Sequence, residues 1–217
     1  MRSLEIVSSS ELLRYADTLE LQKKYVEDLL VKPATPYRLH FLEHSDVLTK
    51  GRGFSQEHML SDESDLIADG VEVVEVSRGG SVTYHGPGQL VVYLHLHLKE
   101  LGIYLTQYFR DLEQWVIDCL GDFGVDAGRR DGMTGVWVKE GKICAMGVAA
   151  KKYVTYHGIG LNVATEMKGF DWIVPCGLQG EPVASLDKIV DQPISRKEVE
   201  ASLLRHLPSW IRDLDRV

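Results

Sequence analysis

The chain carries the tetrapeptide Thr-Tyr-His-Gly twice, at residues 83–86 and 155–158, each time beside apolar stretches that are typical of β-strands. The first copy belongs to the segment 78–89, which contains four glycines, a proline, an arginine and a histidine. Glycines without a Cβ permit tight turns and let backbone N–H groups approach a bound group closely. Two strands that happen to end in glycine turns are the plain alternative. Because core packing does not require this composition, we interpret both copies as parts of a ligand site.

The order of the expected elements favours an α+β fold over a regular βαβ repeat. Apolar residues at helical spacing predict helices over 10–30, with Ser8, Ser9 or Ser10 as N-cap, over 104–120, and over 195–214, where Ser195 and Glu198 form a capping box. Strands are predicted over 37–42, 71–76, 81–84, 90–98 and 153–163, with a hairpin over 135–148 that turns near residues 140–141. These elements indicate one domain, residues 1–217, with a largely mixed or antiparallel sheet.

Length, charge and hydropathy narrow the class of protein. A chain of 217 residues can bury a sizeable core. Its formal net charge of -8 argues against a nucleic-acid-binding protein. No apolar run approaches the roughly 20 residues that a membrane span needs, and the N-terminus lacks a secretory signal pattern. We therefore expect a cytoplasmic protein with neither a nucleic-acid nor a membrane partner.

The three cysteines differ in their expected surroundings. Cys119, Cys144 and Cys176 form no C-x-x-C pair, which argues against a disulfide framework and against a cysteine zinc site. Cys119 and Cys144 lie among apolar residues of a predicted helix and strand, so both are expected to be small buried side chains. Cys176 lies between a proline and a glycine in a predicted loop, which makes it the candidate for a reactive thiol.

A reactive thiol needs an activating neighbour, because a free cysteine with a pKa near about 8.5 is only slightly ionised at neutral pH. His85, His157 and Lys142 are the candidates in this sequence. Lys142 follows the glycine of the predicted hairpin, and by position alone it reads as a solvated turn lysine. Spacing therefore leaves the choice among the three open.

Metal and nucleotide sites are not indicated. His95 and His97 lie two residues apart on a predicted strand and would share a face, as metal ligands can, but no third ligand is apparent. The sequence has neither a phosphate-binding loop of the G-x-x-x-x-G-K-[ST] type nor a Rossmann glycine pattern after a first strand. We expect no metal and no cofactor.

The motifs, taken in chain order, closely resemble those of the lipoyl(octanoyl) transferases. The matching residues are 78–89, Gly141-Lys142-Ile143, 157–162 and Pro175-Cys176-Gly177, and the resemblance runs from about residue 37 to just beyond Cys176. It implies the fold of the biotin and lipoate protein ligases, an α+β domain around a curved mixed sheet. It also implies transfer of octanoyl from octanoyl-acyl carrier protein to a lysine of lipoyl domains, those of 2-oxoacid dehydrogenase complexes and the glycine cleavage H protein.

The same resemblance implies roles for individual residues. Cys176 would be the acyl-thioester nucleophile and Lys142 its activating partner, with His157 as a candidate supporting residue. The implied substrate-binding residues are Arg78, Gly79, Gly80, Ser81, Val82, Thr83, Tyr84, His85, Ala145, Met146, Gly147, Gly158, Ile159 and Gly160. Because a thioester donor is already activated, the transfer would need no ATP, which agrees with the missing phosphate loop.

Three alternatives remain open at the level of sequence. The first is an ATP-dependent lipoate or biotin protein ligase on the same fold, although such a ligase does not need the Pro175-Cys176-Gly177 segment. The second is a related amidotransferase that moves octanoyl between carrier domains and also uses a cysteine. The third is a non-catalytic module that binds acylated carrier proteins, for which a paired cysteine and lysine would have no use.

Overall fold

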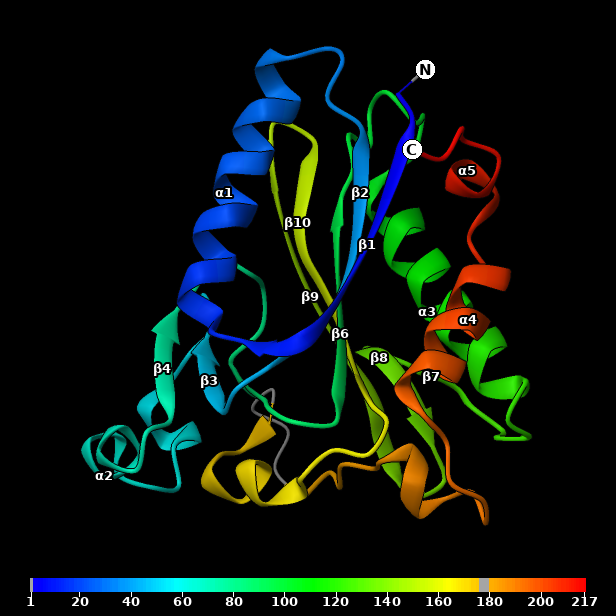
Figure 1. Cartoon of the computed structure of the whole chain (residues 1–217). Helices are drawn as coiled ribbons and strands as arrows, with labels where there is room; N and C mark the ends of the chain where they lie inside the picture. Colours follow the sequence, from blue (N-terminus) through cyan, green and yellow to red (C-terminus); the bar gives the residue numbers. More distant parts are fainter. Residues whose placement is uncertain (1, 176–179) are drawn as a thin grey trace.

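A seven-stranded mixed sheet forms the centre of the computed structural model, which describes residues 2–175 and 180–217 (Figure 1). Its strand order is β1-β2-β6-β10-β9-β8-β7. The strands are β1 (Leu4–Leu13), β2 (Tyr37–His44), β6 (Gln89–His95), β10 (Val154–Asn162), β9 (Gly141–Lys151), β8 (Met133–Val138) and β7 (Gly128–Arg130). β1 is parallel to β2 and the other neighbours are antiparallel. The expected α+β class with a mixed sheet is confirmed.

A second, three-stranded sheet contains β3 (Val47–Lys50) between β4 (Glu72–Glu75) and β5 (Val82–His85). Figure 1 shows α1 (Tyr15–Val31) on one side of the large sheet, and α3 (Leu105–Gly121) and α4 (Arg196–Arg205) on the other. The shorter helices are α2 (Glu63–Ala68) and α5 (Ser209–Arg212), and short 3₁₀ helices span Gln56–His58, Met167–Trp172 and Leu186–Lys188. Among the helices of the described residues, none is both long and apolar enough to cross a membrane.

Strand β6 is buried on both faces because α1 covers one face of the sheet and α3 covers the other. Its residues at positions 90, 92 and 94 pack in the main core with Trp115 of α3. Val91 and Tyr93 point to the opposite face, where they pack with Tyr15 and Leu19 of α1. The period-two alternation of a strand accounts for this division. It also places Val91 and Tyr93 beside the space between α1 and the sheet.

The N-terminal prediction was wrong in its first part. Residues 4–13 form strand β1, and the helix expected over 10–30 begins at Tyr15 with Arg14 as its N-cap. None of the three serines caps it. Instead the carboxylate of Glu72 on β4 accepts hydrogen bonds from the backbone N–H groups of Tyr15 (3.2 Å) and Ala16 (3.3 Å). The helical spacing of apolar residues before Tyr15 therefore does not decide the structure. Residues 4–13 pair in parallel with β2 instead, and Glu72, 57 residues further along the chain, caps the helix at Tyr15.

The C-terminal prediction was right about the start of the helix and wrong about its end. The Ser195 side chain and the Glu198 side chain form the expected capping box at the start of α4. The helix ends at Arg205 and does not run to Leu214. Pro208 follows the helix end and precedes α5, and a proline has no N–H with which to continue a helix.

The remaining predicted elements are present with small shifts at their ends. In the hairpin of β8 and β9, Val136 is opposite Cys144 and Val138 is opposite Gly141. The register shifts between Val136 and Trp137, so that one step along β8 faces two residues of β9. Such a β-bulge bends the strand and redirects side chains, and here its extra residue is Ile143 of β9, next to Lys142.

Candidate active site

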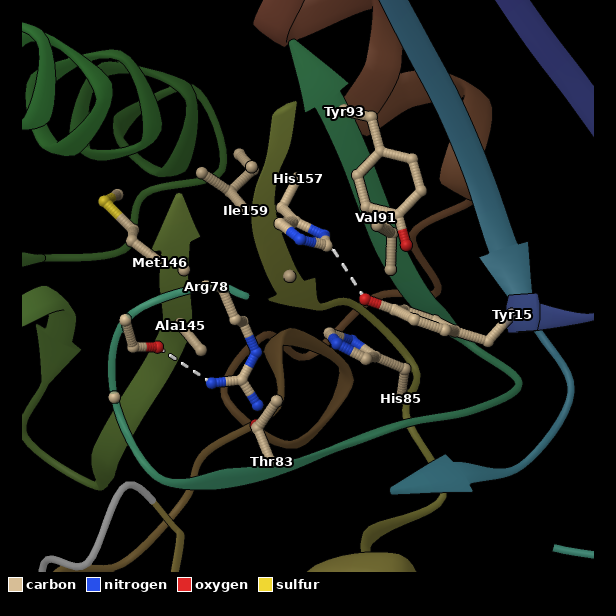
Figure 2. Close-up of a pocket in the computed structure, with 15 residues that line it drawn as sticks. Tyr15, Arg78, Thr83, His85, Val91, Tyr93, Ala145, Met146, His157 and Ile159 are labelled. Atoms are coloured by element: carbon tan, nitrogen blue, oxygen red, sulfur yellow. Dashed lines mark hydrogen bonds between the residues drawn. The ribbon is translucent and has the colours of Figure 1, made fainter. Parts of the chain in front are cut away.

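A pocket lies between α1, the small sheet and the strands β6, β9 and β10 (Figure 2). Its space, counted together with the open mouth, is about 470 Å³. Both Thr-Tyr-His-Gly copies contribute a histidine to its wall. The lining residues are Tyr15, Arg78, Gly79, Gly80, Thr83, His85, Val91, Tyr93, Ala145, Met146, Gly147, His157, Gly158, Ile159 and Gly160.

Most of the predicted substrate-binding residues meet in this pocket, and three do not. Val82 and Tyr84 alternate with Thr83 and His85 along β5, so their side chains turn to the other side of the small sheet and pack with Leu48. The phenol of Tyr84 donates to Asp46 at 2.6 Å. The third residue is Ser81, whose hydroxyl pairs with Nδ1 of His58 at 2.6 Å.

Three lining residues were missed in the sequence. Tyr15 lies on a helix 63 residues before the first motif, counting from 15 to 78, and only the packing of α1 over the sheet brings it to the pocket. Val91 and Tyr93 read as ordinary core residues of a strand. The sequence did contain a signal for them: the strand is apolar at every position from 90 to 94, which indicates burial on both faces. A second layer therefore had to cover the face on which Val91 and Tyr93 lie.

Arg78 is a buried cation that holds the glycine loop in shape. Its Nη2 donates to the carbonyl and the hydroxyl oxygen of Thr49 at 2.6 and 2.7 Å, and its Nη1 donates to the carbonyl oxygens of Gly79 and Ser81 at 3.0 Å each. Its aliphatic stem crosses Gly147, where an added Cβ would lie 2.6 Å from Cδ of Arg78. The missing Cβ at Gly147 is therefore what lets the arginine lie along the pocket wall.

Neutral imidazoles and phenols close the inner end of the pocket. The hydroxyl of Tyr15 pairs with Nδ1 of His157 at 3.3 Å (Figure 2). Behind them, Nδ1 of His44 pairs with the carbonyl oxygen of Leu13 at 2.8 Å, and Nε2 of His44 pairs with the hydroxyl of Tyr93 at 2.6 Å. Both contacts fit the neutral tautomer of His44 that carries its proton on Nδ1. In that tautomer Nδ1–H donates to the carbonyl and Nε2 accepts from the phenol.

Burial keeps these histidines uncharged. Desolvation lowers the pKa of His44 to about 4, and it lowers the pKa of both His85 and His157 to about 3. The interior is therefore free of imidazolium charge at neutral pH. Together with Val91, Met146 and Ile159 on the wall, this surface suits an apolar, uncharged ligand group.

His157 is held in an unusual backbone conformation. Its φ is 59°, which a residue with a Cβ rarely adopts. Its backbone N–H donates to Gln22 of α1 at 2.7 Å, and the side chain is almost fully buried. The surrounding structure, through α1, fixes this imidazole at the pocket wall.

A smaller hollow, about 270 Å³ when its open side is counted, adjoins the pocket and is lined by Lys142. The two spaces share Thr83, Ala145 and Gly160 in their walls. Lys142 is only 9% exposed, and its Nζ lies 5.4 Å from the centre of the Trp137 ring. The lysine that looked like a solvated turn residue in the sequence is thus a buried cation beside the apolar pocket.

Cys176 and its neighbour Gly177 lie outside the described residues. Pro175, which immediately precedes Cys176, lines the hollow of Lys142. On the other side of the undescribed residues, the N–H of Lys142 donates to the carbonyl of Pro182 at 2.9 Å, and Ala184 donates to the carbonyl of Lys142 at 3.0 Å. Both flanks of the segment 176–179 therefore contact the surroundings of Lys142.

The other cysteines and the two histidines considered as metal ligands lie outside the pocket. Cys119 and Cys144 are buried as expected, and burial raises the pKa of both thiols, to about 11 for Cys119. His95 is buried on β6, whereas His97 lies beyond the strand end and stacks on Tyr153. Within residues 2–175 and 180–217, no group of three or more histidine, cysteine or acidic side chains could hold a metal ion.

Comparison with known proteins gives consistent results. Residues 14–208 match the family model described as the lipoyl protein ligase A/B catalytic domain. A protein named octanoyltransferase from Syntrophotalea carbinolica is 40% identical over 198 residues, which covers 91% of this chain and 90% of that protein. An octanoyltransferase from Pelobacter propionicus is also 40% identical, over 90% of both chains.

Solved structures show the same fold at low sequence identity. A bi-partite lipoate protein ligase from Thermoplasma acidophilum, studied with its E2 lipoyl domain, has a TM-score of 0.69 and 18% identity, covering 100% of this chain and 87% of that one. A lipoate-protein ligase A bound with ATP has a TM-score of 0.71 and 19% identity, covering 100% and 90%. The predicted lipoate ligase-like architecture is therefore confirmed.

Proposed function

Because this chain belongs to the lipoyl protein ligase A/B catalytic-domain family and is 40% identical to octanoyltransferases over nearly its whole length, we propose that it transfers octanoyl to lipoyl domains through a Cys176 thioester. Octanoyl transfer is the activity that these relatives' name gives. The finer proposal adds octanoyl-acyl carrier protein as donor, Cys176 as nucleophile and Lys142 as acid and base.

One observation carries the residue assignment. Pro175, next to Cys176 in the chain, and Lys142 line one hollow, and this hollow shares Thr83, Ala145 and Gly160 with the apolar pocket. An acyl chain in the pocket would thus have its carbonyl end directed toward the lysine. Burial of each methylene contributes about 0.8 kcal/mol, so the apolar part of the pocket wall stabilises the bound acyl chain and leaves the thioester at the hollow.

In the first half-reaction, the Cys176 thiolate attacks the carbonyl carbon of the octanoyl thioester. The new carbon–sulfur bond forms, the tetrahedral intermediate collapses, and the bond to the carrier thiol breaks. The ammonium of Lys142 gives its proton to the departing sulfur. The products are octanoyl-Cys176, a free carrier thiol and neutral Lys142.

In the second half-reaction, the neutral amine of the target lysine attacks octanoyl-Cys176. The amide bond forms, the bond to Sγ of Cys176 breaks, and Lys142 takes the proton from the attacking nitrogen. The thiolate and the ammonium are thereby restored. No step needs ATP, a metal or another cofactor, because the thioester is already activated.

The proposal includes the acceptors named from the sequence, the lipoyl domains of 2-oxoacid dehydrogenase complexes and the glycine cleavage H protein. It also treats residues 1–217 as one catalytic domain, which the family match over 14–208 supports. The cytoplasmic location stays a prediction from sequence.

The deciding experiment measures the intact mass of an unmodified lipoyl domain after incubation with the enzyme. We expect the octanoyl mass increase with octanoyl-acyl carrier protein and no ATP, and no increase with free octanoate and Mg-ATP. The opposite result would make the chain a ligase and overturn the proposal. Binding of the acylated carrier without any transfer would make it a non-catalytic module.

Variants test the two residues with matched controls on the same chain. Cys176→Ser and Lys142→Ala should each reduce transfer by at least about 100-fold, in the range that loss of a nucleophile or a general base produces. Cys119→Ala, in the core, and Lys139→Ala, at the exposed hairpin turn, should transfer at the unaltered rate. Full activity of Lys142→Ala would remove this lysine from the mechanism.

A further inference from the structure

A buried carboxylate on α3 takes no part in the proposed chemistry. Glu113 is 2% exposed, although the neighbouring buried positions of α3 are mostly apolar. Its Oε2 accepts from Nη1 of Arg110 at 2.8 Å and from Nε of Arg129 at 3.0 Å. Removing a carboxylate from water is costly unless its oxygens are paired, and the two arginines pair only one of them.

The other oxygen of Glu113 reaches the strand beside Lys142. The backbone N–H of Gly135, on β8, donates to Oε1 of Glu113 at 3.2 Å. Gly135 has a φ of +126°, a conformation that glycine adopts readily and other residues do not. Glu113 therefore holds a glycine-dependent point of β8 through a hydrogen bond from outside the sheet.

Gly135 in turn supports the side chain of Lys142. A Cβ at residue 135 would lie 2.6 Å from Cε and 3.3 Å from Nζ of Lys142. The lysine side chain thus rests against the bare Cα of Gly135, and the Trp137 ring lies close to its Nζ. The β-bulge at Ile143 of β9, next to Lys142, pairs with the stretch of β8 just beyond Gly135.

We propose that Glu113 is a positioning residue for Lys142, which it aims at the reacting thioester by clamping Gly135. This inference rests on the proposed role of Lys142 as acid and base. Glu113 acts on the reaction only indirectly. It accepts a hydrogen bond from the backbone N–H of Gly135, and the Lys142 side chain packs against Gly135. Small displacements of a catalytic group can cost about 100-fold in rate, so a loosened Gly135 would be visible in the kinetics.

Two substitutions separate the hydrogen bond from the charge. Glu113→Leu removes the acceptor for Gly135, and we expect the rate of acyl transfer to fall by about 10- to 100-fold. Glu113→Gln keeps an oxygen in that place and should stay within about 3-fold of the unaltered rate. Asp118→Asn, an exposed acidic position on the same helix, is the matched control and should change nothing.

A double-mutant cycle tests whether Glu113 acts through Lys142. If it does, adding Glu113→Leu to Lys142→Ala should lower the rate no further, because the lysine it positions is already gone. A multiplicative loss in the double variant would show a general structural role and overturn the proposal. Full activity of Glu113→Leu, with an unchanged thermal unfolding curve, would overturn it as well.

The outcome is separable from that of the proposed function. If Lys142→Ala is fully active, the lysine has no catalytic role, and both the proposed mechanism and the positioning role of Glu113 fail. Should Lys142→Ala be slow while Glu113→Leu is folded and fast, only the positioning role fails. A ¹³C-methylated Lys142 provides a readout independent of activity: its NMR signal should shift in Glu113→Leu and stay in Glu113→Gln.

Discussion

Acidification should destabilise the protein through the neutral histidines behind the pocket, and His44 allows the size of the effect to be worked out. Its pKa is about 4 in the folded state against 6.5 for the ordinary side chain. Above pH 6.5 the imidazole is neutral in both states. As the pH falls below 6.5, the unfolded chain binds a proton that the folded protein cannot, so stability is lost until about pH 4, where the folded state is protonated too.

At pH 5 this difference corresponds to a loss of about 2 kcal/mol in the free energy of unfolding from His44 alone. His85 and His157, whose pKa values are lowered to about 3, act in the same direction. The cause is burial, which removes the His44 imidazolium from water and so lowers its pKa.

Urea denaturation at pH 7, 6 and 5 measures this effect directly. The unaltered protein should lose stability over the range, and His44→Gln should lose about 2 kcal/mol less. Tyr93→Phe is the control, because it removes the hydrogen-bond partner and keeps the imidazole; its stability should be lower by a similar amount at each pH. The reasoning is refuted if His44→Gln follows the same pH dependence as the unaltered protein.

Three further substitutions test the pocket, a helix start and the core. Gly147→Val should lower octanoyl transfer by more than about tenfold with less effect on shorter acyl donors, because its Cβ would lie 2.6 Å from Cδ of Arg78; equal rates for all donors would contradict this. Ser195→Ala removes the capping box and should lower the melting temperature by about 2–4 °C at unchanged transfer. Phe41→Ala empties a fully buried position and should cost about 3–5 kcal/mol in urea denaturation.

The sequence predicted correctly those features that depend on residues close together in the chain. The capping box of Ser195 and Glu198 involves atoms three residues apart, and it forms as predicted. The hairpin of β8 and β9 likewise depends on adjacent residues. The glycine-rich segment 78–89 forms part of one wall of the pocket, as its glycines, arginine and histidine indicated in the sequence.

Features that depend on distant partners were not predictable in the same way. Tyr15 became a pocket residue because α1 packs over the sheet, and the helix starts there because Glu72 caps it. Lys142 is expected from the sequence to be solvated. In the structure it is buried, because it lies next to a β-bulge in its hairpin and its side chain packs against Gly135. Nothing in the sequence distinguished Glu113 from the other acidic residues of its helix; its burial, its arginine partners and its hydrogen bond to Gly135 set it apart in the structure.

The most direct measurement concerns the covalent intermediate on Cys176. The enzyme is incubated with octanoyl-acyl carrier protein without an acceptor, and the adduct is weighed by intact mass and located by peptide mapping. We expect one octanoyl group on Cys176 that hydroxylamine removes and that an added lipoyl domain accepts. A hydroxylamine-labile adduct that persists in Cys176→Ser, or octanoyl transfer by that variant at full rate, would contradict the thioester mechanism.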